Sequence, residues 1–324
     1  MRVLITGGAG FLGSLLASRI LANGSLPVGG SAPAPVDEVV LVDLAEPAPG
    51  LAADPRVSVR TGELAAQMPG APDVDVMFHL AGVVSGAAEA DFDLGMRGNL
   101  DGTRAVLERC RAQAVSPLLV FSSSLAVFGQ DPALPPLGEV HDDTLPRPQT
   151  SYGTQKFIGE LLVADYARKG FVRGRSVRLM TVSVRPGRPN AAASGFLSGI
   201  VREPLAGLRA MCPVPPDTEV ALSSPRRTIE GLLRAVEVSD DDWGSRSAMT
   251  LPALTTTPKA MAESLDRVTG TSTSDLIDWE EDPAITAMFA TWPAHFRTDR
   301  AAALGLEPER SFDDVVRAYL DDLG

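Results

Sequence analysis

A glycine-rich turn near the N-terminus is the feature that most constrains the fold. The apolar run Arg2-Val-Leu-Ile-Thr6 is typical of a buried strand, and Gly7-Gly-Ala-Gly10-Phe-Leu-Gly13 follows it directly. Apolar residues at helical spacing continue to Leu21. Glycines at 8, 10 and 13, or at 7, 10 and 13, between a strand and a helix predict a dinucleotide-binding turn. They permit a tight bend, let the backbone approach a pyrophosphate, and place a helix N-terminus beside the phosphates.

The rest of the first half alternates apolar strands with stretches that can form helices. Further strands are predicted at 38–43, 57–60, 74–80, 118–121 and 176–184, and helices at 88–113 and 151–169. The segment 24–37 is rich in Gly, Pro, Ser and Ala and predicts an irregular surface loop. Strands that alternate with helices indicate a parallel sheet with helices on its faces.

The pattern changes after Pro186. Proline and glycine are frequent over 186–225, and helical stretches are predicted at 226–238, 257–268 and 308–323. We therefore expect an α/β protein: a Rossmann-type, doubly wound parallel sheet over residues 1–185 and a smaller, mixed C-terminal substrate-binding cap over 186–324. The chain can pass between the two parts more than once.

Composition limits the partners of the chain. Asp and Glu number 41 against 29 Lys and Arg, a formal net charge of −12. Nucleic acids and anionic membranes attract basic faces, so neither is expected as a partner. No apolar run approaches the roughly 20 residues of a membrane-spanning helix, and the apolar run after Met1 is too short for a signal peptide. The chain has only two cysteines, Cys110 and Cys212, which lie far apart in the sequence, and only three histidines, so we expect no metal site. The low cysteine content is typical of a protein in the reducing cytoplasm.

An acidic residue ends the second predicted strand. A carboxylate placed after the glycine turn accepts hydrogen bonds from the adenosine ribose and repels a 2′-phosphate. Asp43 is in that position, with the 24–37 loop accounting for its distance from Gly13, and Glu46 is a second candidate. Asp43 can also be an ordinary turn residue at a strand end. As a ligand it favours NAD over NADP.

A tyrosine and a lysine lie at i and i+4 in the predicted helix 151–169. In Ser151-Tyr152-Gly-Thr-Gln-Lys156 the two side chains share one helix face. A nearby ammonium favours the phenolate and lets tyrosine act as a base toward an alcohol. The chain has only three tyrosines and three lysines, which makes a chance pairing rare. The serine run 122–124 directly follows the fifth strand, and a hydroxyl there can hold the substrate oxygen or cap a turn.

Together these residues resemble the extended short-chain dehydrogenase/reductases, the NAD-dependent epimerase/dehydratase group. The resemblance covers roughly residues 1–190 and also includes His79-Leu-Ala-Gly82 and Asn99-Leu-Asp-Gly-Thr103. It implies a catalytic set of Ser124, Tyr152 and Lys156. Glu63 stands where the group more often has Asp. The cofactor contacts that the turn, Asp43 and the resemblance predict are Gly7, Gly10, Phe11, Leu12, Gly13, Asp43, Glu63, Leu64, Leu80, Ala81, Gly82, Ser85, Asn99, Tyr152 and Lys156.

A narrower resemblance concerns the substrate. The segments 83–86, 91–97, 184–190 and 200–207 are similar to the group of dehydrogenases that oxidise the four-carbon sugar acid D-erythronate at C2 to 2-oxo-tetronate with NAD. A sugar acid carries a carboxylate, which needs a cation or several donors. Arg185, Arg188 and Arg202 follow the last strand and are candidates, and each can equally be a surface residue. The substrate contacts we expect are Ser85, Ser124, Tyr152, Thr181, Arg185 and Arg188.

Other functions fit part of this pattern. A sugar-nucleotide epimerase with tightly bound NAD uses the same Ser, Tyr and Lys. A dehydratase would have an acidic pair after the serine, where this chain has Leu125-Ala126. A non-enzymatic NAD sensor would not need Tyr152 and Lys156. By analogy within the superfamily, the helices at 88–113 and 151–169 can form a homodimer.

Overall fold

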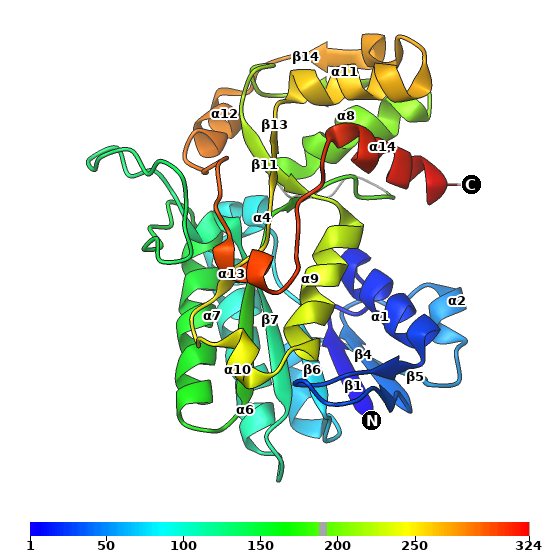
Figure 1. Ribbon diagram of the computed structural model, residues 1–324, viewed down its shortest axis with the longest axis vertical. Helices are drawn as coiled ribbons and strands as arrows, with labels where there is room; N and C mark the ends of the chain where they lie inside the picture. Colours follow the sequence, from blue (N-terminus) through cyan, green and yellow to red (C-terminus); the bar gives the residue numbers. More distant parts are fainter. Residues whose placement is uncertain (188–192, 324) are drawn as a thin grey trace.

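A seven-stranded sheet forms the centre of the computed structural model, which describes residues 1–187 and 193–323 (Figure 1). Its strands all pair in parallel, in the order β12-β8-β7-β6-β1-β4-β5. The predicted doubly wound parallel sheet is confirmed. The strands are β1 (Arg2–Thr6), β4 (Glu38–Asp43), β5 (Val57–Thr61), β6 (Val76–His79), β7 (Leu118–Ser124), β8 (Arg173–Leu179) and β12 (Met249–Thr250).

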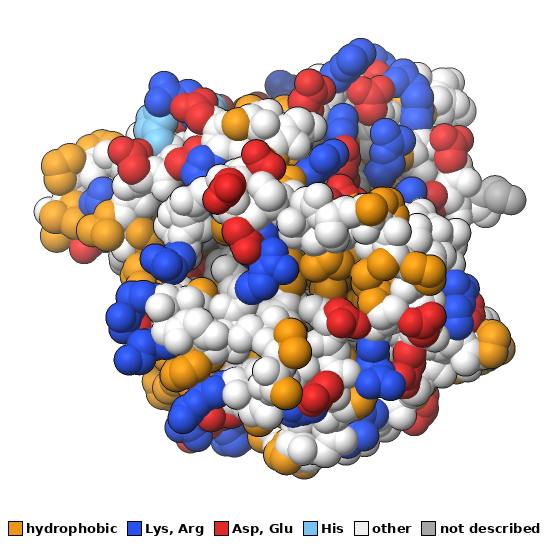
Figure 2. All heavy atoms as spheres, turned by 60° about the horizontal axis from the view of Figure 1, so that its bottom comes forward, with side chains coloured by type: hydrophobic (Ala, Val, Ile, Leu, Met, Phe, Trp, Pro, Cys, Tyr) orange, Lys and Arg blue, Asp and Glu red, His pale blue; other side chains and the backbone are white. Residues whose placement is uncertain are grey.

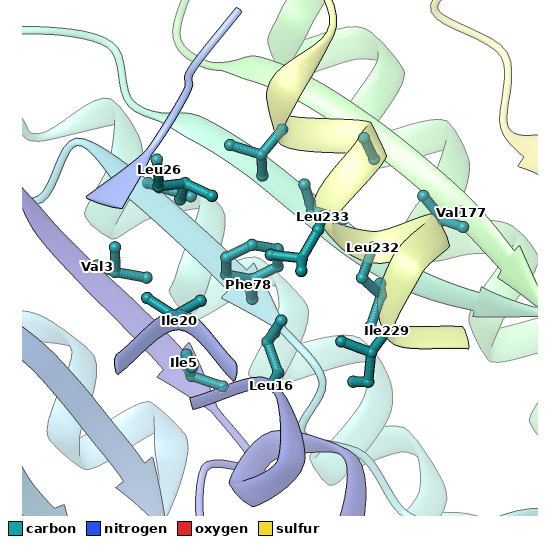
Figure 3. Close-up of a cluster of buried hydrophobic side chains, with 14 of the residues drawn as sticks. Val3, Ile5, Leu16, Ile20, Leu26, Phe78, Val177, Ile229, Leu232 and Leu233 are labelled. Carbon is teal, nitrogen blue, oxygen red and sulfur yellow. The ribbon is translucent and has the colours of Figure 1, made fainter. Parts of the chain in front are cut away.

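Successive side chains of a strand point to opposite faces of the sheet, so alternate residues are buried against the helices of different faces. On one face, Val3 and Ile5 pack with α1 (Phe11–Asn23) and α9 (Pro225–Glu237), which lie side by side. Figure 3 shows this cluster around Phe78. On the other face, Leu4 packs with α6 (Gly102–Arg111) and α7 (Ser151–Arg168). Covering both faces explains why the central strands β1, β4 and β6 contain continuous apolar runs.

The predicted helix 88–113 is wrong in one respect, because Asp91 interrupts it. The region contains four elements, of which the last three follow one another directly. These are α4 (Ser85–Ala90), α5 (Phe92–Gly95), the π-helical turn η2 (Met96–Asp101) and α6. Asp91 interrupts the first helix: its backbone is extended, and its side chain accepts from the Leu94 N–H at 2.9 Å to start α5. The wide turn η2 then leads into α6.

The predicted strand 176–184 is also divided. β8 ends at Leu179, and β9 (Thr181–Val182) pairs instead with β11 (Val220–Ser223) in a small mixed sheet that includes β13 (Leu254–Thr256). The break at Met180 turns the chain toward the C-terminal part of the molecule. The sequence pattern could not show it, because both halves are equally apolar.

The predicted loop 24–37 contains a short hairpin, β2 (Ser25–Leu26) with β3 (Ala34–Pro35). Its turn packs on the C-terminal end of α9. The N–H groups of Gly29 and Gly30 donate to the carbonyl oxygens of Val236 and Glu237, at 2.8 and 2.7 Å. The hairpin thereby satisfies carbonyl groups that a helix end leaves unpaired.

The C-terminal elements form a second layer with its own core at one end of the molecule (Figure 1). The main helices are α8 (Phe196–Leu205), α11 (Pro258–Thr269) and α14 (Phe312–Asp321), beside the paired strands β10 (Ala210–Cys212) and β14 (Ile277–Trp279). Yet α9 and β12 lie on the large sheet. The chain therefore crosses back after residue 186, and the division at residue 185 stays a prediction.

Short elements complete the chain. They are α2 (Pro49–Ala52), α3 (Leu64–Gln67), η1 (Met68–Gly70), η3 (Leu125–Val127), η4 (Ala193–Gly195), α10 (Asp240–Trp243), η5 (Thr273–Leu276), α12 (Pro283–Phe289) and α13 (Asp299–Ala303). On the face drawn in Figure 2, basic and acidic side chains are interspersed. Among the described residues, no helix has both the length and the apolar character needed to span a membrane.

Candidate active site

A cavity of about 730 Å³ opens at the carboxyl ends of the central strands. Such edges are where open α/β sheets bind ligands. Asn99 is not among its lining residues, and Arg188 lies outside the described residues. The predicted site residues that line it are Gly7, Gly10, Phe11, Leu12, Gly13, Asp43, Glu63, Leu64, Leu80, Ala81, Gly82, Ser85, Ser124, Tyr152, Lys156, Thr181 and Arg185.

The glycine turn is shaped by close backbone contacts. Gly7 has a φ of +72°, and a Cβ there would lie 2.8 Å from the Ala81 nitrogen. A Cβ on Gly13 would collide with the Gly7 carbonyl oxygen. Helix α1 starts with no side chain of the described residues capping its first N–H groups. These free groups and the positive end of the helix dipole can hold a diphosphate.

Asp43 is fixed by the same turn. Its Oδ2 accepts from the N–H groups of Ala9 and Gly10 at 3.0 and 3.2 Å, and its Oδ1 accepts from the Ala45 N–H at 3.2 Å. The carboxylate therefore stands beside the turn, at the end of β4. Glu46 has a different partner, since it accepts from the Thr61 hydroxyl at 2.5 Å.

Lys156 lies in the wall of the cavity and is almost completely buried. Only 4% exposed, it donates from Nζ to the Ser122 carbonyl oxygen at 2.8 Å. Nζ lies 5.8 Å from the centre of the Tyr152 ring. Burial lowers the pKa of Lys156 to about 8, and the charge of Glu160 acts against this change. An ammonium with this pKa can exchange its proton near neutral pH.

Tyr152 lies between a hydroxyl and a cation. Burial raises the pKa of the Tyr152 phenol above its usual value. The Ser124 hydroxyl and the Arg185 charge act in the opposite direction. A positive charge brought into the cavity would favour the phenolate further.

His79 and Asn99 belong to a buried hydrogen-bond network next to the residues that line the cavity. The Ala81 N–H donates to Thr6 Oγ1 (3.2 Å), which lies 2.7 Å from His79 Nδ1. His79 Nε2 lies 3.0 Å from Thr103 Oγ1, which donates to the Asn99 carbonyl oxygen at 2.6 Å. Because that donation uses the only Thr103 hydroxyl proton, His79 donates through Nε2 and accepts at Nδ1. His79 therefore links Ala81, which lines the cavity, to Asn99 of η2.

The Asn99 side chain is committed to protein groups. Its Oδ1 accepts from the Val83 N–H at 2.8 Å, and its Nδ2 donates to the Val83 carbonyl oxygen and to Gln155 Oε1, at 3.1 and 2.8 Å. Gln155 precedes Lys156 in α7. Asn99 thus aligns the loop after β6 with the helix that carries Tyr152 and Lys156.

The far end of the cavity is made by segments that are distant in sequence. Thr181 and Arg185 come from the chain after β8, Ser194 from η4, and Trp292 from the loop after α12. Arg185 Nε donates to the Val182 carbonyl oxygen at 3.1 Å. No Asp or Glu within residues 1–187 and 193–323 forms an ion pair with Arg185, and burial lowers its pKa. A partly buried cation beside Tyr152 is suited to an anionic substrate.

Sequence reasoning missed several lining residues. Arg97 belongs to the segment 91–97 but is not among the predicted site residues, and neither are Ser194 and Trp292. Nothing local marks the last two, because their place depends on how the C-terminal layer packs on the sheet. Arg202 was a candidate for the carboxylate, yet it is outside the cavity lining and donates to the Arg185 carbonyl oxygen at 2.8 Å.

The arrangement can perform acid–base chemistry on an alcohol. A phenol lies beside a buried ammonium and a serine hydroxyl, next to a surface that can hold a dinucleotide. Such a set can remove a proton from a substrate hydroxyl while a hydride leaves the same carbon.

The chain is similar to known proteins over its full length. The D-erythronate dehydrogenase of Cupriavidus necator is 50% identical, over 100% of this chain and 99% of that protein. The D-erythronate dehydrogenase of Haemophilus influenzae is 39% identical, over 99% of each chain. A crystal structure described as the nucleoside-diphosphate-sugar epimerase from Agrobacterium tumefaciens has a TM-score of 0.88 at 38% identity, covering 99% of this chain and 94% of that one.

The family is shown directly. The model of the NAD dependent epimerase/dehydratase family matches residues 3–219, which include the glycine turn, Asp43, Tyr152 and Lys156. The family resemblance predicted from the sequence is confirmed, and with it a nicotinamide cofactor. This chain belongs to the NAD dependent epimerase/dehydratase family.

Proposed function

We propose that this protein is an NAD-dependent dehydrogenase that oxidises D-erythronate at C2 to 2-oxo-tetronate. Two full-length relatives named D-erythronate dehydrogenase support this substrate. The observation that carries the proposal is Arg185, a cation beside Tyr152 that no carboxylate of the described residues neutralises. A sugar acid supplies that carboxylate next to the alcohol that Tyr152 deprotonates.

The chain's own residues prepare the alcohol for oxidation. Arg185 orients the carboxylate of the acid, with Thr181 and Ser85 beside its hydroxyl groups. Ser124 donates to the C2 oxygen, and Tyr152, as the phenolate, accepts the C2 hydroxyl proton. Lys156 stabilises the phenolate electrostatically. A bound nicotinamide supplies the acceptor for the C2 hydride.

The adenosine end of the cavity favours NAD over NADP. Asp43 is fixed against the turn, and the next residues, Leu44, Ala45 and Glu46, include no cation to receive a 2′-phosphate. Asp43→Asn should lower the ratio of NAD to NADP efficiency about tenfold, since it removes one charge repulsion. Steady-state kinetics with both cofactors would measure this ratio. An unchanged ratio would place the discrimination elsewhere.

A direct assay tests the activity. Purified protein with excess NAD should form NADH with D-erythronate, and more slowly or not at all with L-threonate and five-carbon aldonates. NADH absorbance reports the reaction without a coupling enzyme. No reaction with any acid would contradict the proposed substrate class.

A sugar-nucleotide epimerase is the second candidate, favoured by the description of the Agrobacterium tumefaciens structure. An epimerase returns the hydride to the sugar and keeps its cofactor. NAD that stays bound through purification, with interconversion of UDP-hexoses and no net NADH, would favour this function.

We propose a homodimer in the cytoplasm. Helix α5 packs beside α7, and both leave large apolar side chains uncovered: Phe92 is 59% exposed and Leu161 is 55% exposed. Exposed apolar side chains on two neighbouring helices can become buried between two copies of the chain. Cys110 and Cys212 are free thiols, as a reducing compartment allows. Sedimentation of the protein at several concentrations would test the dimer.

A further inference from the structure

Arg97 lies in the cavity wall without a role in the proposed reaction. It is the second residue of η2, is exposed, and lines the same cavity as the glycine turn and Tyr152. No ion pair or side-chain hydrogen bond holds it within the parts of the chain that the structure describes. The nearby carboxylate of Asp101 pairs with Arg104 and not with Arg97, with 4.0 Å between Asp101 Oδ1 and Arg104 Nη2.

The neighbours of η2 show where Arg97 stands along the cavity. Gly98 lies against Val83, since an added Cβ would come within 2.5 Å of Val83 Cγ2. Gly102 lies against Leu64, since a Cβ added to Gly102 would lie 3.3 Å from Leu64 Cδ2. Arg97, next to Gly98, therefore lies toward the Val83 end of the cavity, where Gly82 approaches Lys156. From there the wall formed by η2 and the first residue of α6 extends to the Leu64 end, which holds Asp43. A dinucleotide that spans this cavity has its diphosphate between those ends.

The charges of the cavity leave the diphosphate without another cation. In the described parts of the chain, the lining cations are Arg97, Lys156 and Arg185. Lys156 and Arg185 are held at the Tyr152 end by backbone carbonyl groups. The glycine turn contains no lysine or arginine, and the lining acids Asp43, Glu63 and Asp101 add negative charge.

We propose that Arg97 binds the diphosphate of the nicotinamide dinucleotide. A guanidinium can donate two parallel hydrogen bonds to phosphate oxygens, which complements the single N–H groups at the start of α1. Arg97 is then a positioning residue that fixes the cofactor along the cavity and takes no part in proton transfer. The inference rests on the cofactor of the family and is independent of which sugar acid is oxidised.

Binding measurements on Arg97→Gln test this role. Calorimetry should show NAD and ADP-ribose bound about tenfold to a hundredfold more weakly, because a charged hydrogen-bond partner is lost. Adenosine, which lacks phosphate, should bind as in the wild type. Arg97→Lys should recover part of the affinity. The kcat at saturating NAD and substrate should stay within about twofold, which a general structural defect would not allow.

Arg104→Gln is the matched control. Arg104 is exposed on α6, one turn from η2, and is absent from the cavity lining, so its loss should leave all three affinities unchanged. Equal weakening of adenosine and ADP-ribose by Arg97→Gln would overturn the proposal. Unchanged binding of every nucleotide, with only the KM of the sugar acid raised, would also overturn it and assign Arg97 to the substrate. Calorimetry needs no turnover, so failure here is distinct from failure of the proposed activity.

Discussion

The two ends of the cavity are built differently. The cofactor end is formed by runs of consecutive residues, from a seven-residue turn and the loops that follow β4, β5 and β6. The substrate end includes side chains from segments that lie far apart in the sequence, among them Tyr152, Thr181 and Trp292. Contacts made by a tight turn tolerate few substitutions, and because their residues are consecutive they can be recognised in the sequence. Side-chain contacts can change one at a time, so this end can acquire a new substrate while the cofactor end stays the same.

Tyr152→Phe should have the largest effect on catalysis and almost none on the cofactor end. Removing a general base lowers kcat by about 10²- to 10⁴-fold, while the Kd for NAD should change little. Tyr166→Phe is the matched control, because its hydroxyl bonds Glu108 far along the same helix. Stopped-flow rates and NAD titration measure the two quantities. A variant with more than about a tenth of the wild-type kcat would remove Tyr152 from the base role.

Gly13→Ala should damage the cofactor end and the fold together. The new methyl group would collide with the Gly7 carbonyl oxygen, so we expect a loss of about 3 kcal/mol in unfolding free energy. Urea denaturation measures this loss. Gly50→Ala is the control, since a Cβ there meets no atom within 4 Å. Equal stability of the two variants would mean that the turn can relax.

Arg185→Gln should affect substrate binding and leave cofactor binding unchanged. We expect the KM for D-erythronate to rise about tenfold to a hundredfold, because a charged partner of the carboxylate is lost. The Kd for NAD should stay constant. Arg226→Gln, an exposed arginine outside the cavity, should change neither constant. A KM that does not move would assign the carboxylate to other donors.

His79 should give the smallest effect, a stability change with pH. Burial and the Lys156 charge lower the pKa of His79 to about 3 in the folded chain, below its ordinary 6.5. Between these values the unfolded chain binds the extra proton, so stability falls as pH decreases below 6.5, by at most about 1.4 kcal/mol per pH unit. NMR should show the His79 imidazole unchanged from pH 8 to 5. Titration of His79 near pH 6.5 would disprove the neutral, buried ring.

The contrast between the ends also explains what could be predicted from the sequence. The turn, Asp43 and the Tyr152–Lys156 pair depend on short spacings within one or two elements, and the cavity brings them together. The break at Met180 and the π-helical turn around Asn99 depend on contacts with distant strands and helices. Trp292 reaches the cavity only because α12 packs where it does. Local periodicity carries no information about such contacts.

The pairing of β12 with β8 has a consequence for how this chain can be divided. Residues 249–250 extend the large sheet beside β8, and α9 covers one of its faces. A fragment that stops at residue 185 would leave β8 as an open edge with unpaired N–H and C=O groups, and its apolar face would be bare. Edges of this kind recruit other chains and aggregate. We therefore expect that residues 1–185 do not fold stably on their own. Fusion proteins or chimaeras that exchange the substrate end must keep residues 225–251 with the sheet.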